Sequence, residues 1–73
     1  MAVETSSGSD ILVNGVPITT GAATLAELVN ELGHGDTRIA TARNGNFVPD
    51  RLRGATQLVP GDKIEIVSPR QGG

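Results

Sequence analysis

One segment of this chain has the pattern of an amphipathic helix, and it limits what the other residues can build. Apolar residues recur there at helical spacing and form one stripe: Leu25, Leu28, Val29 and Leu32. Thr24 with Glu27 three residues later fits a capping box, which satisfies free N–H groups of the first turn. Gly33 and Gly35 are typical of a helix end. A helix with a single apolar stripe needs one apolar surface to cover.

Two short strands joined by a tight turn are expected before the helix. Asn14-Gly15 suits a type I′ turn, because both central residues of that turn take positive φ. The pair separates two apolar segments, residues 11–13 and 16–19. Pro17 has no N–H to donate, so the second strand is expected at the margin of a sheet.

Further strands and turns are expected after the helix. Residues 59–62, Val-Pro-Gly-Asp, match a type II turn, in which proline sets φ at the second position and glycine takes a positive φ at the third. A second Asn-Gly pair at 44–45 predicts another hairpin turn. The expected elements are, in order, a strand within 38–44, a strand at 47–48, a helical turn over 49–52 and an alternating strand over 63–67.

This order of elements predicts an α+β fold of the β-grasp (ubiquitin-like) type, a small mixed sheet packed against one main helix. A right-handed crossover would place the first and last strands side by side in the middle of the sheet. We expect a disordered N-terminal arm over 1–9, the β-grasp domain over 10–67 and a flexible Gly-Gly tail over 68–73. The pattern of the strand within 38–44 leaves open which of its faces points inward. The expected core comprises Ile11, Val13, Ile18, Leu25, Leu28, Val29, Leu32, Ile39, Val48, Leu52, Leu58, Ile64 and Ile66.

The composition excludes several classes of function. A chain of 73 residues makes one small domain, and it has no cysteine, tryptophan or tyrosine. A formal charge of −2 argues against a nucleic-acid binder. No apolar run approaches the roughly 20 residues that cross a bilayer, and residues 1–10 lack the features of a secretory signal, so a cytoplasmic protein is expected. The lone His34 has no second histidine or cysteine with which to bind a metal, and we interpret it as a helix cap.

The final two residues, Gly72-Gly73, have the greatest chemical consequence. A carboxylate is a poor electrophile, but adenylation by ATP turns it into a mixed anhydride that a thiol, persulfide or amine can attack. Two residues without Cβ form the slimmest end that could enter another protein's nucleotide site. The pattern therefore predicts a protein that other enzymes modify at Gly73.

Three stretches of the second half occur together at a compact length. They are Ala-Arg-Asn-Gly-Asn-Phe-Val-Pro at 42–49, Leu-Val-Pro-Gly-Asp-Lys-Ile-Glu-Ile-Val at 58–67, and the final Gly-Gly. In this order, and with the leucine-striped helix before them, they resemble the ThiS family of ubiquitin-like sulfur carrier proteins of thiamin biosynthesis. The resemblance covers about residues 10–73. One departure is Leu52-Arg53, near which the family often carries a tryptophan.

The resemblance implies a reaction that other proteins catalyse. An E1-like adenylating enzyme (ThiF-like) would use ATP and magnesium to adenylate the Gly73 carboxylate. Sulfur from a cysteine-desulfurase persulfide would then replace AMP and leave a thiocarboxylate. A thiazole synthase (ThiG-like) would take that sulfur while it builds the thiazole ring. The protein would be a co-substrate and not an enzyme, with no bound cofactor or metal, and Gly72 would let the tail thread into both partners.

A docking surface for these partners is expected on the sheet face opposite the helix. Strand alternation would present there some of Thr41, Arg43, Lys63, Glu65 and Val67. Arg43 and Lys63 are the candidate docking residues on this face. Arg70, beside the tail, is a further candidate that could pair with an acidic patch on the adenylating enzyme, and a merely solvated arginine is the alternative.

Three other functions share some of these features. A MoaD-like small subunit of molybdopterin synthase has the same fold and a Gly-Gly thiocarboxylate, but its tail usually has paired prolines close to the glycines. A ubiquitin-like modifier would form an isopeptide bond through Gly73, and only the attacking nucleophile distinguishes it from a carrier. An interaction domain of β-grasp shape would keep its function without Gly72-Gly73.

Overall fold

The computed structural model describes residues 8–34 and 38–68. The predicted arm over 1–9 and the predicted tail over 68–73 therefore lie for the most part outside the described residues. Gly35, Arg70, Gly72 and Gly73 lie outside them as well. The first strand begins at Ser9, the last residue of the predicted arm.

The first two strands form the predicted hairpin. β1 (Ser9–Val13) pairs antiparallel with β2 (Val16–Thr20) along its whole length. Asn14 and Gly15 join them with φ angles of +52° and +83°, both positive as a type I′ turn requires. β2 lies at one margin of the sheet, as predicted from Pro17.

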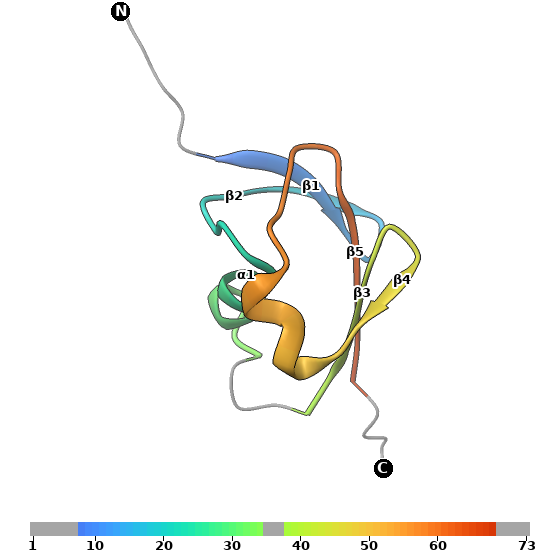
Figure 1. Cartoon of the computed structure of the whole chain (residues 1–73). Coiled ribbons are helices and arrows are strands. Elements are labelled where there is room, and N and C mark those ends of the chain that lie inside the picture. The colour runs from blue at the N-terminus through green and yellow to red at the C-terminus, as the bar shows by residue number, and fades with distance from the viewer. Residues whose placement is uncertain (1–7, 35–37, 69–73) are drawn as a thin grey trace, which may run out of the picture.

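The helix α1 (Leu25–Glu31) covers one face of the sheet (Figure 1). The hydroxyl oxygen of Thr24 accepts a hydrogen bond from the Glu27 N–H at 3.2 Å, which confirms the predicted cap. The Glu27 carboxylate accepts in turn from the Ala23 N–H at 2.8 Å, one residue before the usual position in a capping box. Gly33, with a φ of +88°, follows the helix end.

The second half supplies a second hairpin, a short helix and the last strand. β3 (Ala40–Arg43) pairs antiparallel with β4 (Asn46–Val48). The helical turn predicted over 49–52 is longer in the structure, a 3-10 helix η1 (Asp50–Ala55). The predicted type II turn closes with a hydrogen bond from the Asp62 N–H to the Val59 carbonyl at 3.1 Å, and β5 (Lys63–Val67) follows it.

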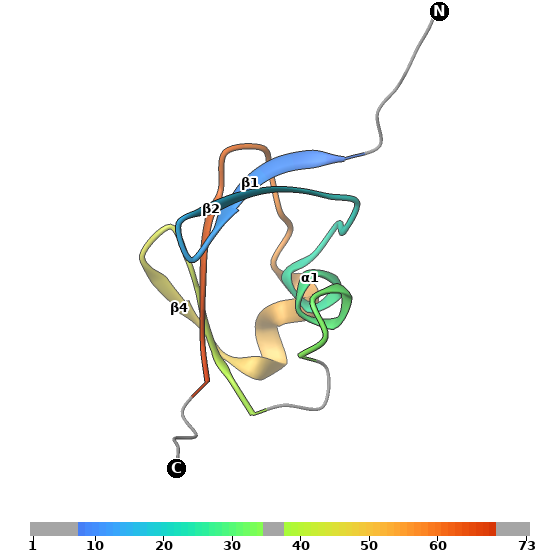
Figure 2. The ribbon, with the colours of Figure 1, turned by 180° about the vertical axis from the view of Figure 1, so that it is seen from behind.

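The sheet has the strand order β2-β1-β5-β3-β4. β5 lies between the two hairpins, parallel to β1 and antiparallel to β3. Figure 2 shows the same arrangement from behind, with α1 and η1 on one side of the strands. The first and last strands are neighbours in the middle of the sheet, so the predicted β-grasp architecture is confirmed.

The core lies between α1 and the sheet. Its buried apolar members are Ile11, Leu25, Leu28, Val29, Val48, Ile64 and Ile66. Val13, Ile18, Ile39 and Leu58, also predicted, are partly buried against this cluster. The predictions for Leu32 and Leu52 are wrong, because these side chains are 38% and 46% exposed. Leu32 is the C-cap of α1: its N–H still donates to the Leu28 carbonyl at 3.0 Å, but its side chain lies at the open end of the helix and stays exposed.

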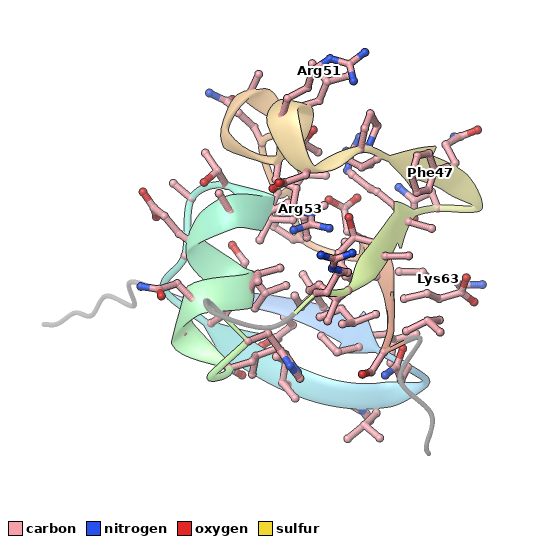
Figure 3. The ribbon with its side chains drawn as sticks, turned by 90° about the horizontal axis from the view of Figure 1, so that it is seen from below. Phe47, Arg51, Arg53 and Lys63 are labelled. Carbon is pink, nitrogen blue, oxygen red and sulfur yellow. The ribbon has the colours of Figure 1, made fainter. Side chains whose placement is uncertain are left out.

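Arg53 is buried in η1, where the sequence pattern had placed Leu52 (Figure 3). Its Nε donates to the Thr41 hydroxyl at 3.0 Å, and one terminal nitrogen donates to the Ile39 carbonyl at 2.8 Å. Thr41 is itself fully buried and donates to the Val48 carbonyl at 2.8 Å. The inward face of β3 is therefore the one that carries Thr41, and a polar network joins it to η1.

Candidate functional site

The candidate site consists of the tail and the surface around its origin. β5 is the middle strand of the sheet, and Ser68 is the last described residue after it. Gly72 and Gly73, the predicted threading and modification residues, and Arg70 continue the chain beyond the described part. The structure therefore places the origin of the tail at the end of a strand that is held on both sides.

The sheet surface opposite α1 is called here the outer face, and it comprises Ala42, Phe47, Lys63, Glu65 and Val67. The strand register brings these residues together, because Ala42 lies opposite both Phe47 and Glu65. Residues that lie opposite one another on adjacent strands share a face. Phe47 and Val67 are 68% and 59% exposed. Figure 3 shows Phe47 and Lys63 on the same side of the sheet, away from α1.

The structure separates the residues predicted for this docking surface. Lys63, Glu65 and Val67 lie on the outer face and are exposed. Thr41 is fully buried on the helix side, so its prediction as an outer-face residue is wrong. Arg43 lies opposite the buried Ile64, and it too belongs to the helix side, at the end of β3. Strand alternation correctly predicts that Thr41 and Arg43 share one face of β3. It does not tell which face of β3 points toward the helix.

Phe47 is the outer-face residue that the sequence interpretation missed. It is the only aromatic residue of the chain and its ring is exposed. A signal for it was present, because a two-residue Asn-Gly turn at 44–45 places residue 47 opposite residue 42. Exposed aromatic side chains are enriched where proteins bind one another. The outer face thus combines an apolar centre with the charges of Lys63 and Glu65.

Asp62 organises the end of the sheet where β5 begins. Its buried carboxylate accepts hydrogen bonds from Arg43 Nε at 2.8 Å, from the Val59 N–H at 2.9 Å and from Asn44 Nδ2 at 3.0 Å. Burial by itself acts to raise the pKa of Asp62. The hydrogen bonds from Arg43, Val59 and Asn44, with the charge of Arg43, outweigh burial and hold that pKa below its ordinary value.

Arg43 forms an ion pair with Asp62 and so has a structural role. Arg43 is about one-third exposed while its partner Asp62 is buried, so its guanidinium is tied to the turn that precedes β5. A residue in this position can still border a docked protein. Lys63, in contrast, projects from the outer face itself (Figure 3).

A shallow hollow of about 390 Å³ lies between α1 and η1. Its lining residues are Ala26, Glu27, Val29, Asn30, Asp50 and Arg53. The lining contains no Ser, Thr, Cys or Lys side chain that could act as a nucleophile, and no glycine-rich loop for a phosphate. Among the described residues, no group of three or more His, Cys, Asp or Glu side chains is placed to hold a metal ion.

Comparison with known proteins identifies the group to which this architecture belongs. The model of the ThiS family matches residues 11–73, from β1 through the two final glycines. The chain belongs to the ThiS family. Among solved structures, it is similar to the crystal structure of the thiamine biosynthesis protein ThiS from Geobacter metallireducens, with 28% identity and a TM-score of 0.72 over 88% of this chain and 99% of that one. No curated protein matches the chain.

Membership of the ThiS family confirms the resemblance found in the sequence. It also supports the coarser functional prediction, a sulfur carrier of thiamine biosynthesis. Across residues 8–34 and 38–68, no helix combines the length and the apolar character needed to cross a membrane.

Proposed function

We propose that this ThiS-family protein carries sulfur as a thiocarboxylate on Gly73 and donates it for formation of the thiazole ring of thiamin. The observation that carries the proposal is the extent of the family match, which continues through both final glycines. The carboxylate of Gly73 attacks the α-phosphorus of ATP and releases pyrophosphate. A persulfide sulfur then attacks the activated carbonyl carbon and AMP leaves. A second thiol then attacks the donor's sulfur in the S–S bond and forms a disulfide with the donor, and the sulfur that leaves remains on Gly73 as the thiocarboxylate.

The protein is a co-substrate in this scheme, and its partners catalyse each step. A ThiF-like adenylating enzyme binds ATP and Mg²⁺, a cysteine desulfurase supplies the persulfide, and a ThiG-like thiazole synthase accepts the sulfur. Five residues follow Ser68, and a fully extended chain of five residues spans at most about 17 Å. The body of the carrier must therefore dock close to each partner's active site, and Gly72 keeps the threaded end narrow.

The outer face is the proposed docking surface. Phe47 and Val67 supply exposed apolar area, and Val67 lies directly before the tail. Lys63 would pair with an acidic side chain of the adenylating enzyme. Arg43 would border this contact from the end of β3, and Arg70 would add a second cation near the threaded tail.

The mass of the intact protein tests the central reaction. The protein is incubated with ATP, Mg²⁺, a sulfur donor and its ThiF-like enzyme, and the expected change is the replacement of one oxygen by sulfur. The same incubation of a variant that lacks Gly73 should leave the mass unchanged. No gain in an enzyme preparation that is active on another carrier would contradict the proposal. Adducts on lysine side chains, without accumulated thiocarboxylate, would instead indicate a protein modifier.

A charge reversal tests the docking surface. Lys63→Glu should weaken enzyme-driven adenylation, because it places a negative charge on the proposed contact. Arg51→Glu is the matched control, since Arg51 is exposed on η1, on the opposite side of the sheet (Figure 3). Equal adenylation rates for both variants would contradict the outer face as the docking surface. Arg43→Glu is a poorer probe, because it would also break the ion pair with Asp62.

A further inference from the structure

The side chain of Asn14 holds the end of β5. Its Oδ1 accepts a hydrogen bond from the Ile66 N–H at 2.9 Å, and its Nδ2 donates to the Ile66 carbonyl at 3.1 Å. The backbone N–H of Asn14 donates to the Ile64 carbonyl at 2.8 Å. One residue of the first hairpin turn thus makes three hydrogen bonds to the strand that carries the tail.

These contacts extend a ladder that the backbone cannot continue. β1 pairs with β5 in parallel register at Leu12 with Lys63 and at Val13 with Ile64, and then the chain turns away at Gly15. If the parallel ladder continued in the same register, the Ile66 N–H would donate to the backbone carbonyl of residue 14, and the Ile66 carbonyl would accept from the N–H of residue 16. The amide of Asn14 supplies the same acceptor and donor in their place. Asn14 makes these contacts with a φ of +52°, a backbone conformation that asparagine tolerates better than most residues.

The two sides of β5 are therefore held differently at the end of the strand. On the β3 side, Val67 still lies opposite Ala40 in the backbone ladder. On the β1 side, the Asn14 side chain bonds the backbone of Ile66. Without that side chain the end of β5 would be held from the β3 side alone, and the origin of the tail would be less firmly fixed, while Val67 would keep its pairing with Ala40.

We propose that Asn14 is a positioning residue of the carrier reaction, which sets the point and direction at which the tail leaves the sheet. This inference rests on the proposed function. A tail that starts from one fixed point loses less conformational freedom when Gly73 enters a partner's active site. Asn14 contributes to the rate of modification of Gly73 although it lies 59 positions away in the sequence.

Asn44 provides a matched comparison in the same molecule. It occupies the equivalent position of the other Asn-Gly turn, with the same φ of +52°. Its side-chain carbonyl accepts from the Lys63 N–H at 2.9 Å, and its own N–H donates to the Lys63 carbonyl at 2.7 Å. Asn44 therefore holds the start of β5, and Asn14 holds the end.

The test compares Asn14→Gly with Asn44→Gly in the full chain. Both substitutions keep a turn that tolerates positive φ and remove the side-chain amide. Hydrogen exchange should accelerate about five- to tenfold at the Ile66 N–H in the first variant and at the Lys63 N–H in the second, the effect of losing one ordinary hydrogen bond. The maximal adenylation rate should fall about fivefold for Asn14→Gly, with little change in KM, and less than twofold for Asn44→Gly.

Equal adenylation rates for the two glycine variants, both shown to be folded, would overturn the positioning role. So would an unchanged maximal rate in Asn14→Gly when Ile66 exchanges faster. Asn14→Asp keeps the acceptor for the Ile66 N–H, and its rate should lie between those of the parent and the glycine variant. Failure of the unsubstituted protein to be adenylated would overturn the proposed function itself, and the positioning role with it.

Discussion

Replacement of Arg53 by alanine should destabilise the domain more than any other single change in η1. Arg53 is only 9% exposed. Its guanidinium donates hydrogen bonds to the Thr41 hydroxyl and the Ile39 carbonyl. Truncation leaves the Ile39 carbonyl without this donor and removes the link between η1 and β3. Hydrogen bonds that involve a charged group contribute about 1.5 to 3 kcal/mol each. The third contact, to Asp50 at 3.4 Å, adds about 0.5 kcal/mol or less, because the Asp50 side chain is 92% exposed.

The expected loss for Arg53→Ala is therefore about 3 kcal/mol of unfolding free energy. For a domain of this size such a loss lowers Tm by on the order of 12 to 24 °C. The assay is thermal and urea unfolding followed by circular dichroism, with Arg51→Ala as the control. Arg51 belongs to the same short helix and is exposed (Figure 3), so its replacement should change stability by about 0.5 kcal/mol or less.

Two results would refute this reasoning. Equal stabilities of the Arg53→Ala and Arg51→Ala variants would show that the buried guanidinium does not anchor η1. A loss in Asp50→Asn as large as that in Arg53→Ala would show that the ion pair, and not the contacts with Thr41 and Ile39, carries the effect.

Three further predictions concern other contacts. The pKa of Asp62 is lowered in the folded state, so its ion pair stabilises the fold above the ordinary carboxyl pKa of about 3.9, and that stabilisation is lost as the pH falls through the lower, folded-state pKa. Asp62→Asn should thus be less stable at pH 7 and show a flatter loss of stability toward pH 2 in urea titrations; parallel pH profiles would contradict this account. Thr24→Ala should cost about 1 kcal/mol in the same assay, since the Glu27 N–H loses its acceptor, and an unchanged midpoint would show that the cap is dispensable. Phe47→Ser should leave Tm nearly unchanged and raise the KM for adenylation, and an unchanged KM would exclude the ring from the contact.

Most of the fold could be predicted because its signals are local. The Asn-Gly pairs at 14–15 and 44–45 define both hairpin turns with positive φ, and Pro17 marks the sheet margin. Thr24 and Glu27 define the start of the helix through hydrogen bonds between close neighbours in sequence. Each of these features depends on a few adjacent residues, so the sequence pattern is sufficient.

The errors occur where distant segments decide the outcome. Leu32 continues the apolar stripe, but it is the C-cap residue at the end of the helix, and no distant segment covers its side chain there. Arg53 takes the buried position expected for Leu52, because Thr41 and the Ile39 carbonyl offer partners to a guanidinium. No pattern within η1 reveals these partners, which lie in and beside β3. The inward direction of β3 is also decided by these distant partners, and it determines which residues belong to the proposed docking surface.

The position of β5 between the two hairpins also determines when a newly made chain can fold. The residues of both hairpins leave the ribosome first, and β5, the strand that joins the two hairpins, is synthesised after them. Contacts such as the one between Asn14 and Ile66, 52 positions apart, form only when β5 is available. Ile64 and Ile66 complete the core in the same step. Under the proposed function, a partner that recognises the assembled sheet would therefore select against unfinished chains, because an incomplete chain lacks the strand that precedes the tail.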